Sequence, residues 1–197
     1  MVHHLTPIDD EPVFFPSTQV PPLTDAQFKQ ATWDYVQNAA TATTKWGDIG
    51  DLDVSGVKDF SYAFSTYRDQ AGGSTVINGN PKAATFVGTA ISKWNTASAT
   101  TLYRTFYEAS AMNADLTGWK VGKVVKLDGT FYLAAKFIGT GLDSWDVAKV
   151  TSMSSTFYSL TSCNKRKIAD AWKSSAVFVA TDYDTDWAAD TCPVRFE

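Results

Sequence analysis

Residues 145–158 read Trp-Asp-Val-Ala-Lys-Val-Thr-Ser-Met-Ser-Ser-Thr-Phe-Tyr, and two earlier stretches of the chain follow the same pattern. The copies begin at Trp94, Trp119 and Trp145, which are 25 and 26 residues apart, and a Phe-Tyr pair closes each copy. Agreement at several kinds of position in one register indicates a tandem repeat of about 26 residues. The other matching positions are Leu102, Leu127 and Met153, then Phe106, Phe131 and Phe157.

A fourth copy lies upstream, and an insertion interrupts it. Its apolar positions run from Leu52 to Phe64, and the next apolar position of the register is Phe86. The later copies cover the same step with far fewer residues, so we place an insertion near residues 66–83. A loop that breaks one repeat is a candidate binding element, and a neutral change of length is an equally good interpretation.

The spacing within one copy predicts its local structure. Val147, Val150 and Met153 are three residues apart, whereas Met153, Phe157 and Leu160 follow the spacing of one helix face. This predicts a short extended piece followed by a helical turn. Since one copy cannot bury its own apolar side chains, stacked copies must bury them together. The predicted fold is therefore an α/β, short leucine-rich-repeat-like solenoid of short strands and helical turns.

The ends of the chain differ from the repeats and predict caps. Thr24-Asp-Ala-Gln27 is a capping-box pattern before a helical periodicity, which predicts an N-terminal cap helix within residues 24–45. The repeats then span residues 46–162, and a C-terminal cap spans residues 163–197. Residues 1–23 hold five of the seven prolines and predict an extended arm.

Two features of the ends are candidate contacts. The arm carries Phe14 and Phe15, an exposed apolar pair that would dock on this domain or on a partner. The two cysteines, Cys163 and Cys192, both lie in the C-terminal quarter. They are a candidate disulfide that closes the C-terminal cap, and two free thiols are the alternative.

The string at residues 145–158 resembles the repeat of the BspA-like family of leucine-rich-repeat surface proteins. Residues 46–57 are also similar to that family's entry into its first repeat. Thr105, Thr130 and Thr156 depart from the family pattern, because they replace an apolar residue before the Phe. The resemblance implies a microbial surface, secreted or adhesion protein that binds rather than catalyses. It also implies an extracellular or cell-surface location, or a membrane-enclosed, oxidising compartment.

The Tyr residues that follow each repeat Phe are the best ligand candidates. Tyr107, Tyr132 and Tyr158 share one register and would form a ladder on the repeat surface. Such a ladder could bind a sugar face or the apolar side chains of a protein. The alternative is that the rings pack against one another and only hydrate their hydroxyl groups.

Composition and motifs disfavour several other classes of function. A net charge of −4 disfavours nucleic acid, and no apolar run is long enough for a direct membrane span. Both histidines lie in the arm, so neither a catalytic set nor a metal site is predicted, and no motif indicates a cofactor. Residues 182–186 begin like a calcium loop, but Trp187 and Pro193 stand where its Gly and Glu should be.

The function that these features indicate is a non-catalytic recognition or adhesion module that binds a protein or glycan partner. The alternative is a structural subunit of a larger assembly, such as a virion, a filament or a membrane complex, docked through the N-terminal arm. The ligand itself is not encoded in any motif that we recognise.

Overall fold

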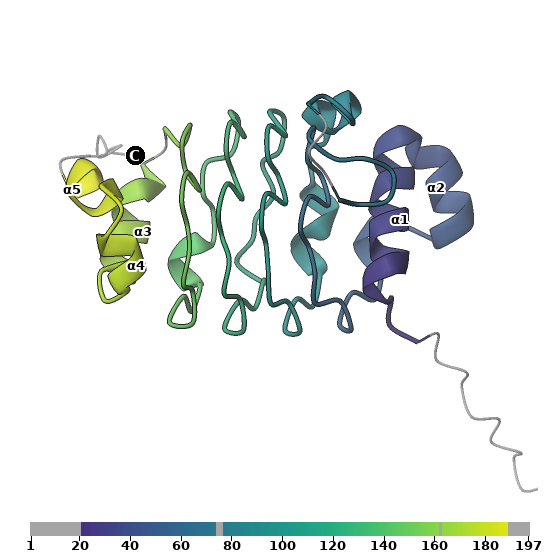
Figure 1. Cartoon of the computed structure of the whole chain (residues 1–197). Coiled ribbons are helices and arrows are strands. Elements are labelled where there is room, and N and C mark those ends of the chain that lie inside the picture. The colour runs from purple at the N-terminus through teal and green to yellow at the C-terminus, as the bar shows by residue number, and fades with distance from the viewer. Residues whose placement is uncertain (1–20, 74–76, 162, 189–197) are drawn as a thin grey trace, which may run out of the picture.

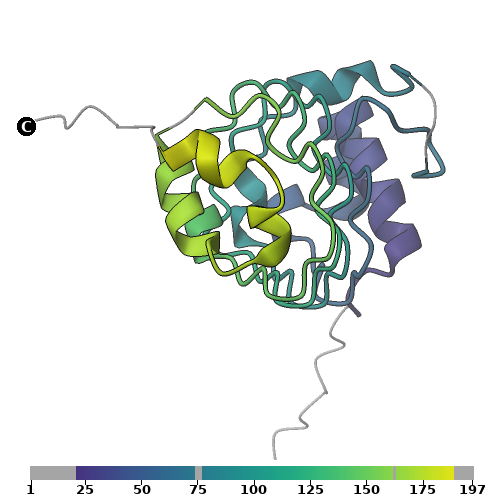
Figure 2. The same cartoon turned by 60° about the vertical axis from the view of Figure 1, so that its left-hand side comes forward.

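The computed structural model describes residues 21–73, 77–161 and 163–188. The repeat copies form a row in Figure 1, with α1 and α2 at one end and α3, α4 and α5 at the other, and Figure 2 shows the last three covering that end. The helices are α1 (Asp25–Gln37), α2 (Ala39–Trp46), α3 (Asn164–Trp172), α4 (Ala176–Val179) and α5 (Tyr183–Ala188), with 3-10 helices η1 (Ile49–Asp51), η2 (Pro81–Thr85), η3 (Thr89–Lys93) and η4 (Leu142–Ser144).

Backbone hydrogen bonds join each copy to the next along one side of the row. The donors are the N–H groups of alternate residues, and each donates to a carbonyl group of the following copy. Between the second and third copies the bonds run from Leu102 to Lys126, from Arg104 to Asp128 and from Phe106 to Thr130, at 2.9–3.0 Å. We call this series the ladder; it keeps the copies in register.

The ladder does not make a sheet, and the predicted α/β leucine-rich-repeat-like solenoid is wrong. The described residues contain no strand; single parallel bridges alone join Asp59, Thr101, Lys126 and Ser152. Each copy folds instead into successive β-turns. In the turn from Leu102 to Thr105, the Thr105 N–H donates to the Leu102 carbonyl at 3.1 Å.

The third residue of that turn explains why neither strand nor helix forms. Arg104 has a φ of 52°, and the equivalent residues of the other copies, Tyr62, Gly129 and Ser155, also have positive φ. A residue in the left-handed region interrupts an extended strand and a right-handed helix alike. The helical turn predicted from Met153 to Leu160 is therefore a pair of β-turns, although its apolar residues do face the core.

Two columns of stacked aromatic rings fill the core. The Phe column has centroid separations of 5.7–6.0 Å and the Trp column has separations of 6.2–6.4 Å. Each of these fully buried rings contributes roughly 1.5–3 kcal/mol by removal of apolar surface from water. The members are Phe64, Phe106, Phe131 and Phe157, and Trp94, Trp119, Trp145 and Trp172.

The threonines that replace the expected apolar residue have a structural role. Thr105, Thr130 and Thr156 are fully buried. The hydroxyl group of Thr130 lies 2.7 Å from the Leu127 carbonyl of its own copy and 2.8 Å from the Leu102 carbonyl of the copy before. A buried carbonyl needs a partner, so this row supports both the turn and the junction between copies.

The N-terminal cap is a pair of helices rather than one. Thr24 and Gln27 form the predicted capping box at the start of α1. The helix ends at Asn38, whose side chain caps α2 by accepting from the Thr41 N–H at 3.1 Å. The buried ring of Phe28 then closes the core of the first copy.

The insertion folds onto this cap. Arg68 is fully buried, and its guanidinium donates to the Thr32 hydroxyl at 2.8 Å, to the Ala63 carbonyl at 2.6 Å and to the Lys29 carbonyl. The Gln37 amide donates to the Asn80 side chain at 2.7 Å. The insertion therefore extends the N-terminal cap.

The C-terminal cap imitates a further repeat copy. Although Trp172 of α3 is one residue off the repeat register, its ring stacks on Trp145 and its indole N–H donates to the Leu142 carbonyl at 3.0 Å. Phe178 and Trp187 complete the buried cluster. The Phe157 N–H, a ladder donor, donates to the Tyr183 hydroxyl at 3.3 Å.

Candidate functional site

The predicted tyrosine ladder is assembled on the outer face of the repeats. The rings of Tyr107 and Tyr132 stack at 4.5 Å, and those of Tyr132 and Tyr158 stack at 4.8 Å. Tyr67, at the start of the insertion, meets the edge of the tyrosine ladder, with its ring centre 4.9 Å from that of Tyr107. Tyr158 is 67% exposed, whereas the inner members are half-buried.

The stacking decides which part of each ring a ligand can reach. Both faces of the Tyr132 ring are covered by its neighbours, so it presents its edge and its hydroxyl group to solvent. A sugar that binds aromatic side chains by stacking needs a free ring face. Along the tyrosine ladder, only the outer face of the Tyr158 ring is free. The tyrosine ladder therefore suits a ligand that contacts ring edges and hydroxyl groups.

A positively charged side chain, Arg104, lies beside the tyrosine ladder. The guanidinium of Arg104 lies 5.2 Å from the ring centre of Tyr103 and 4.9 Å from that of Tyr107. These cation–π contacts hold a half-buried arginine in place without neutralising its charge. The ion pairs among the described residues use Lys29, Lys45, Lys93 and Arg166, and none of them involves Arg104.

A hollow opens next to this arginine, with a volume of about 440 Å³. Its floor is Gly129, where an added Cβ atom would lie 3.2 Å from both Arg104 Cγ and Tyr107 Cδ2. The glycine therefore lets the side chains of Arg104 and Tyr107 lie close against the backbone at this point of the lining. We call it the Arg104 hollow, and its lining is Tyr103, Arg104, Tyr107, Asp128, Gly129, Tyr132, Ser154 and Ser155.

The acid of the hollow is partly used by the fold. Asp128 Oδ1 accepts the Ser154 N–H at 3.1 Å and also the Ser152 hydroxyl. Its carboxylate is not in an ion pair with Arg104, although both line the hollow. The lining of the site therefore offers both a fixed cation and a carboxylate.

The hydroxyl groups of Tyr107 and Tyr62 stay protonated at neutral pH. Burial raises the pKa of Tyr107 to about 12, with further increases from Tyr132 and Glu108 and an opposing effect of Arg104. Burial and Tyr103 likewise raise the pKa of Tyr62. These hydroxyls can therefore donate as well as accept hydrogen bonds on this face.

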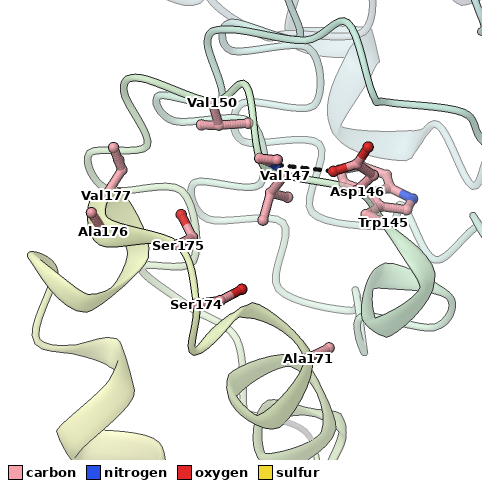
Figure 3. Close-up of a pocket in the computed structure, with 10 residues that line it drawn as sticks. Trp145, Asp146, Val147, Val150, Ala171, Ser174, Ser175, Ala176 and Val177 are labelled. Atoms are coloured by element: carbon pink, nitrogen blue, oxygen red, sulfur yellow. Dashed lines mark hydrogen bonds between the residues drawn. The ribbon is translucent and has the colours of Figure 1, made fainter.

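Two other hollows lie where the last copy meets the C-terminal cap, and Figure 3 shows one of about 490 Å³. Val147 and Val150 line one side, and Ser175 and Val177 line the other. Of the described residues that line it, only Asp146 is ionisable, and it accepts the Ala148 N–H at 3.1 Å. This hollow is a gap in packing and offers a ligand little chemistry.

Other predicted contacts fall in different places. Phe14, Phe15 and Cys192 lie outside the described residues. Cys163 is exposed where α3 begins, although its repeat position predicts a buried side chain. Residues 183–188 form the helix α5 and not a calcium loop.

No group of three His, Cys, Asp or Glu side chains in the described residues could hold a metal ion. Nor does any helix in this part of the chain have the length and apolar character to cross a membrane.

Sequence reasoning found the tyrosines but missed Arg104 and Gly129. Both occupy the register position of Tyr62 and Ser155, so no single residue type repeats there. The available signal was the reverse of repetition: the third copy has a glycine where the copy before it has Arg104 and the copy after it has Ser155. A position that does not repeat on a regular surface is a candidate for a specific role.

Comparison with known families places the chain. The family model described as "Mycoplasma protein of unknown function, DUF285" matches residues 77–181, which is more than half of the chain and covers the last three repeats. Curated proteins and solved structures gave no match. The chain belongs to the DUF285 family.

Proposed function

We propose that this protein is a non-catalytic recognition module, akin to the BspA-like repeat proteins, and that its tyrosine ladder binds a protein partner. The DUF285 family is related to those repeat proteins. We further propose that it works outside the cell, at a cell surface, or in a membrane-enclosed, oxidising compartment, as that relationship implies.

The stacking of the tyrosine rings favours a protein ligand over a glycan. The ring faces of Tyr107 and Tyr132 are stacked on each other, so ring edges and hydroxyl groups form the accessible surface. Tyrosines with a fixed ring and a polar tip are enriched in protein interfaces, where they add contact area at a low entropic cost. Arginine, here Arg104, is likewise enriched among the residues that contribute most to protein interfaces.

Capture from the native source tests this proposal. The full chain and a Tyr132→Ser/Tyr158→Ser variant would be used as baits, with captured proteins measured by quantitative mass spectrometry. We expect one protein at fixed stoichiometry on the parent chain and a loss of about tenfold or more on the variant, as for hot-spot residues. Lys149→Gln, an exposed change on a turn outside the ladder, is the matched control and should keep the partner.

A glycan screen with the same three baits separates the two ligand classes. Binding of a defined glycan that disappears in the tyrosine variant would overturn the assignment to a protein partner. Capture that is equal for all three baits would show that the ladder is not the binding surface. Circular dichroism and urea unfolding would establish that the tyrosine variant keeps its fold.

A further inference from the structure

The Arg104 hollow has a chemistry more specific than a general interface. Two tyrosine rings hold the guanidinium in place, and no carboxylate of the described residues lies within ion-pair distance of it. A guanidinium presents a fork of N–H donors that matches the two oxygens of a carboxylate. The natural occupant of that side of the hollow is therefore a carboxylate.

Asp128 restricts the occupant further. It uses Oδ1 for the Ser154 N–H and the Ser152 hydroxyl, and its second oxygen accepts no hydrogen bond from the described residues. A free carboxylate ligand alone would meet repulsion from Asp128. A ligand with an N–H group close to its carboxylate satisfies both Arg104 and Asp128, and a peptide has that arrangement.

We propose that the Arg104 hollow binds a carboxylate of the partner polypeptide, with Arg104 as its donor and Asp128 accepting a neighbouring amide N–H. This assignment rests on the proposed function, because it names the group by which the protein partner is recognised. The carboxylate belongs either to the C-terminus of the partner or to an acidic side chain. Both sources share this chemistry, and the experiment below separates them.

The register of the repeat explains why the site occurs once. The first copy has Tyr62 at the position of Arg104, and the third and fourth copies have Gly129 and Ser155. A large side chain thus precedes the arginine and small residues follow it. The ligand enters over these small residues, beside the hydroxyl groups of Tyr107 and Tyr132.

A titration of the full chain with short peptides tests the proposal. The probes are N-acetyl-trialanine with a free C-terminus, its C-terminal amide, and the amide of N-acetyl-Ala-Glu-Ala. The readout is the side-chain Nε–H signal of Arg104 in an NMR spectrum, identified by its absence from Arg104→Gln. We expect a saturable shift with a carboxylate-bearing peptide and a response at least about tenfold weaker with trialanine amide.

The stronger of the two carboxylate peptides identifies the source as a C-terminus or an acidic side chain. An equal shift with trialanine amide would overturn the proposal. If no peptide moves the signal while capture of the partner still depends on Tyr132 and Tyr158, the carboxylate assignment fails and the proposed function stands.

A filled hollow provides an independent test. Ser155→Tyr introduces a ring into the lining of the hollow. The equivalent residue of the first copy is Tyr62, with a φ of 59°, so a tyrosine fits the backbone at Ser155, which has a φ of 54°. We expect this variant to bind the carboxylate peptide about tenfold more weakly, as loss of a charged hydrogen bond does. Unchanged binding by Ser155→Tyr, or an equal loss in the control Lys149→Gln, would contradict the location of the site.

Discussion

The two ends of the stack are closed by different means. At the N-terminal end, Phe28 packs on Phe60 at 4.6 Å and on Trp94 at 5.6 Å. The ladder leaves carbonyl groups facing this end, and the buried guanidinium of Arg68 donates to that of Ala63 at 2.6 Å. The insertion thus supplies a strong donor where the fold has acceptors to satisfy.

The C-terminal end continues the aromatic columns but not the ladder. Trp172 extends the Trp column, and the Tyr183 hydroxyl accepts the Phe157 N–H. The N–H groups of Met153 and Ser155 hold the preceding ladder positions, and no described residue accepts a hydrogen bond from them. Hollows of about 490 and 560 Å³ flank this junction.

A directional ladder needs a different cap at each end. One end exposes acceptors, of which Arg68 satisfies the Ala63 carbonyl; the other exposes donors and needs acceptors. In stacked repeats, local unfolding begins where a neighbour is missing. We therefore expect the C-terminal end to open before the N-terminal end.

Removal of either aromatic cap should cause the largest loss in the free energy of unfolding. Phe28→Ala and Trp172→Ala each remove a fully buried ring and leave a cavity, so each should lower the free energy of unfolding by about 3–5 kcal/mol. Urea unfolding of both variants measures this. A loss below about 1 kcal/mol for Trp172→Ala alone would show that the C-terminal cap is not part of the cooperative core.

The next effect concerns the arginine that closes the N-terminal end. Arg68→Ala leaves the oxygens of Thr32, Ala63 and Lys29 without their donor and should cost about 3 kcal/mol. Burial lowers the pKa of Arg68 to about 10, against the effects of Asp69 and Asp34, and the three oxygens accept hydrogen bonds from the buried charge. Arg68→Lys is the control; it keeps the charge, cannot reach all three acceptors, and should recover part of the loss.

The aromatic positions show how much the sequence could predict. The registers of Trp94, Trp119 and Trp145, and of the repeat Phe residues, predicted which side chains stack, because burial imposes periodicity on large apolar residues. The position of the insertion followed from the same register. The tyrosine ladder also follows from it, since any residue type that repeats in register forms a column.

The backbone could not be predicted in the same way. The spacing of Met153, Phe157 and Leu160 fits one face of a helix, but successive β-turns place the same residues on the core side. The deciding feature is the positive φ at Tyr62, Arg104 and Ser155, which are not residue types that favour it strongly. Arg68 was hidden for another reason: a single arginine in an insertion has no repeat partner.

Amide hydrogen exchange can compare ladder N–H groups inside the stack with those at its C-terminal end. Leu127 and Gly129 donate to the fourth copy at 2.8 and 2.9 Å, whereas the equivalent N–H groups of Met153 and Ser155 donate to none of the described residues. Because exchange requires a broken hydrogen bond, we expect Met153 and Ser155 to exchange at least about tenfold faster, as measured by NMR. Equal protection of the two pairs would mean that something closes the C-terminal end in solution.

The smallest expected effect tests the single acceptor that the C-terminal cap provides. Burial raises the pKa of Tyr183 above its ordinary value of 10.0, against the effect of the Phe157 N–H. The folded state therefore holds the proton more tightly than the unfolded chain does. This contribution to stability is complete below pH 10 and is lost as the pH rises through the pKa of the folded state.

Tyr183→Phe removes the titrating group together with the acceptor, at a cost of about 1 kcal/mol near neutral pH. Urea unfolding of both chains at neutral and alkaline pH should show the two stabilities converging as the pH rises above 10. A constant difference across that range would show that Tyr183 keeps its ordinary acidity, whereas equal stabilities at neutral pH would show that its hydroxyl does not close the ladder.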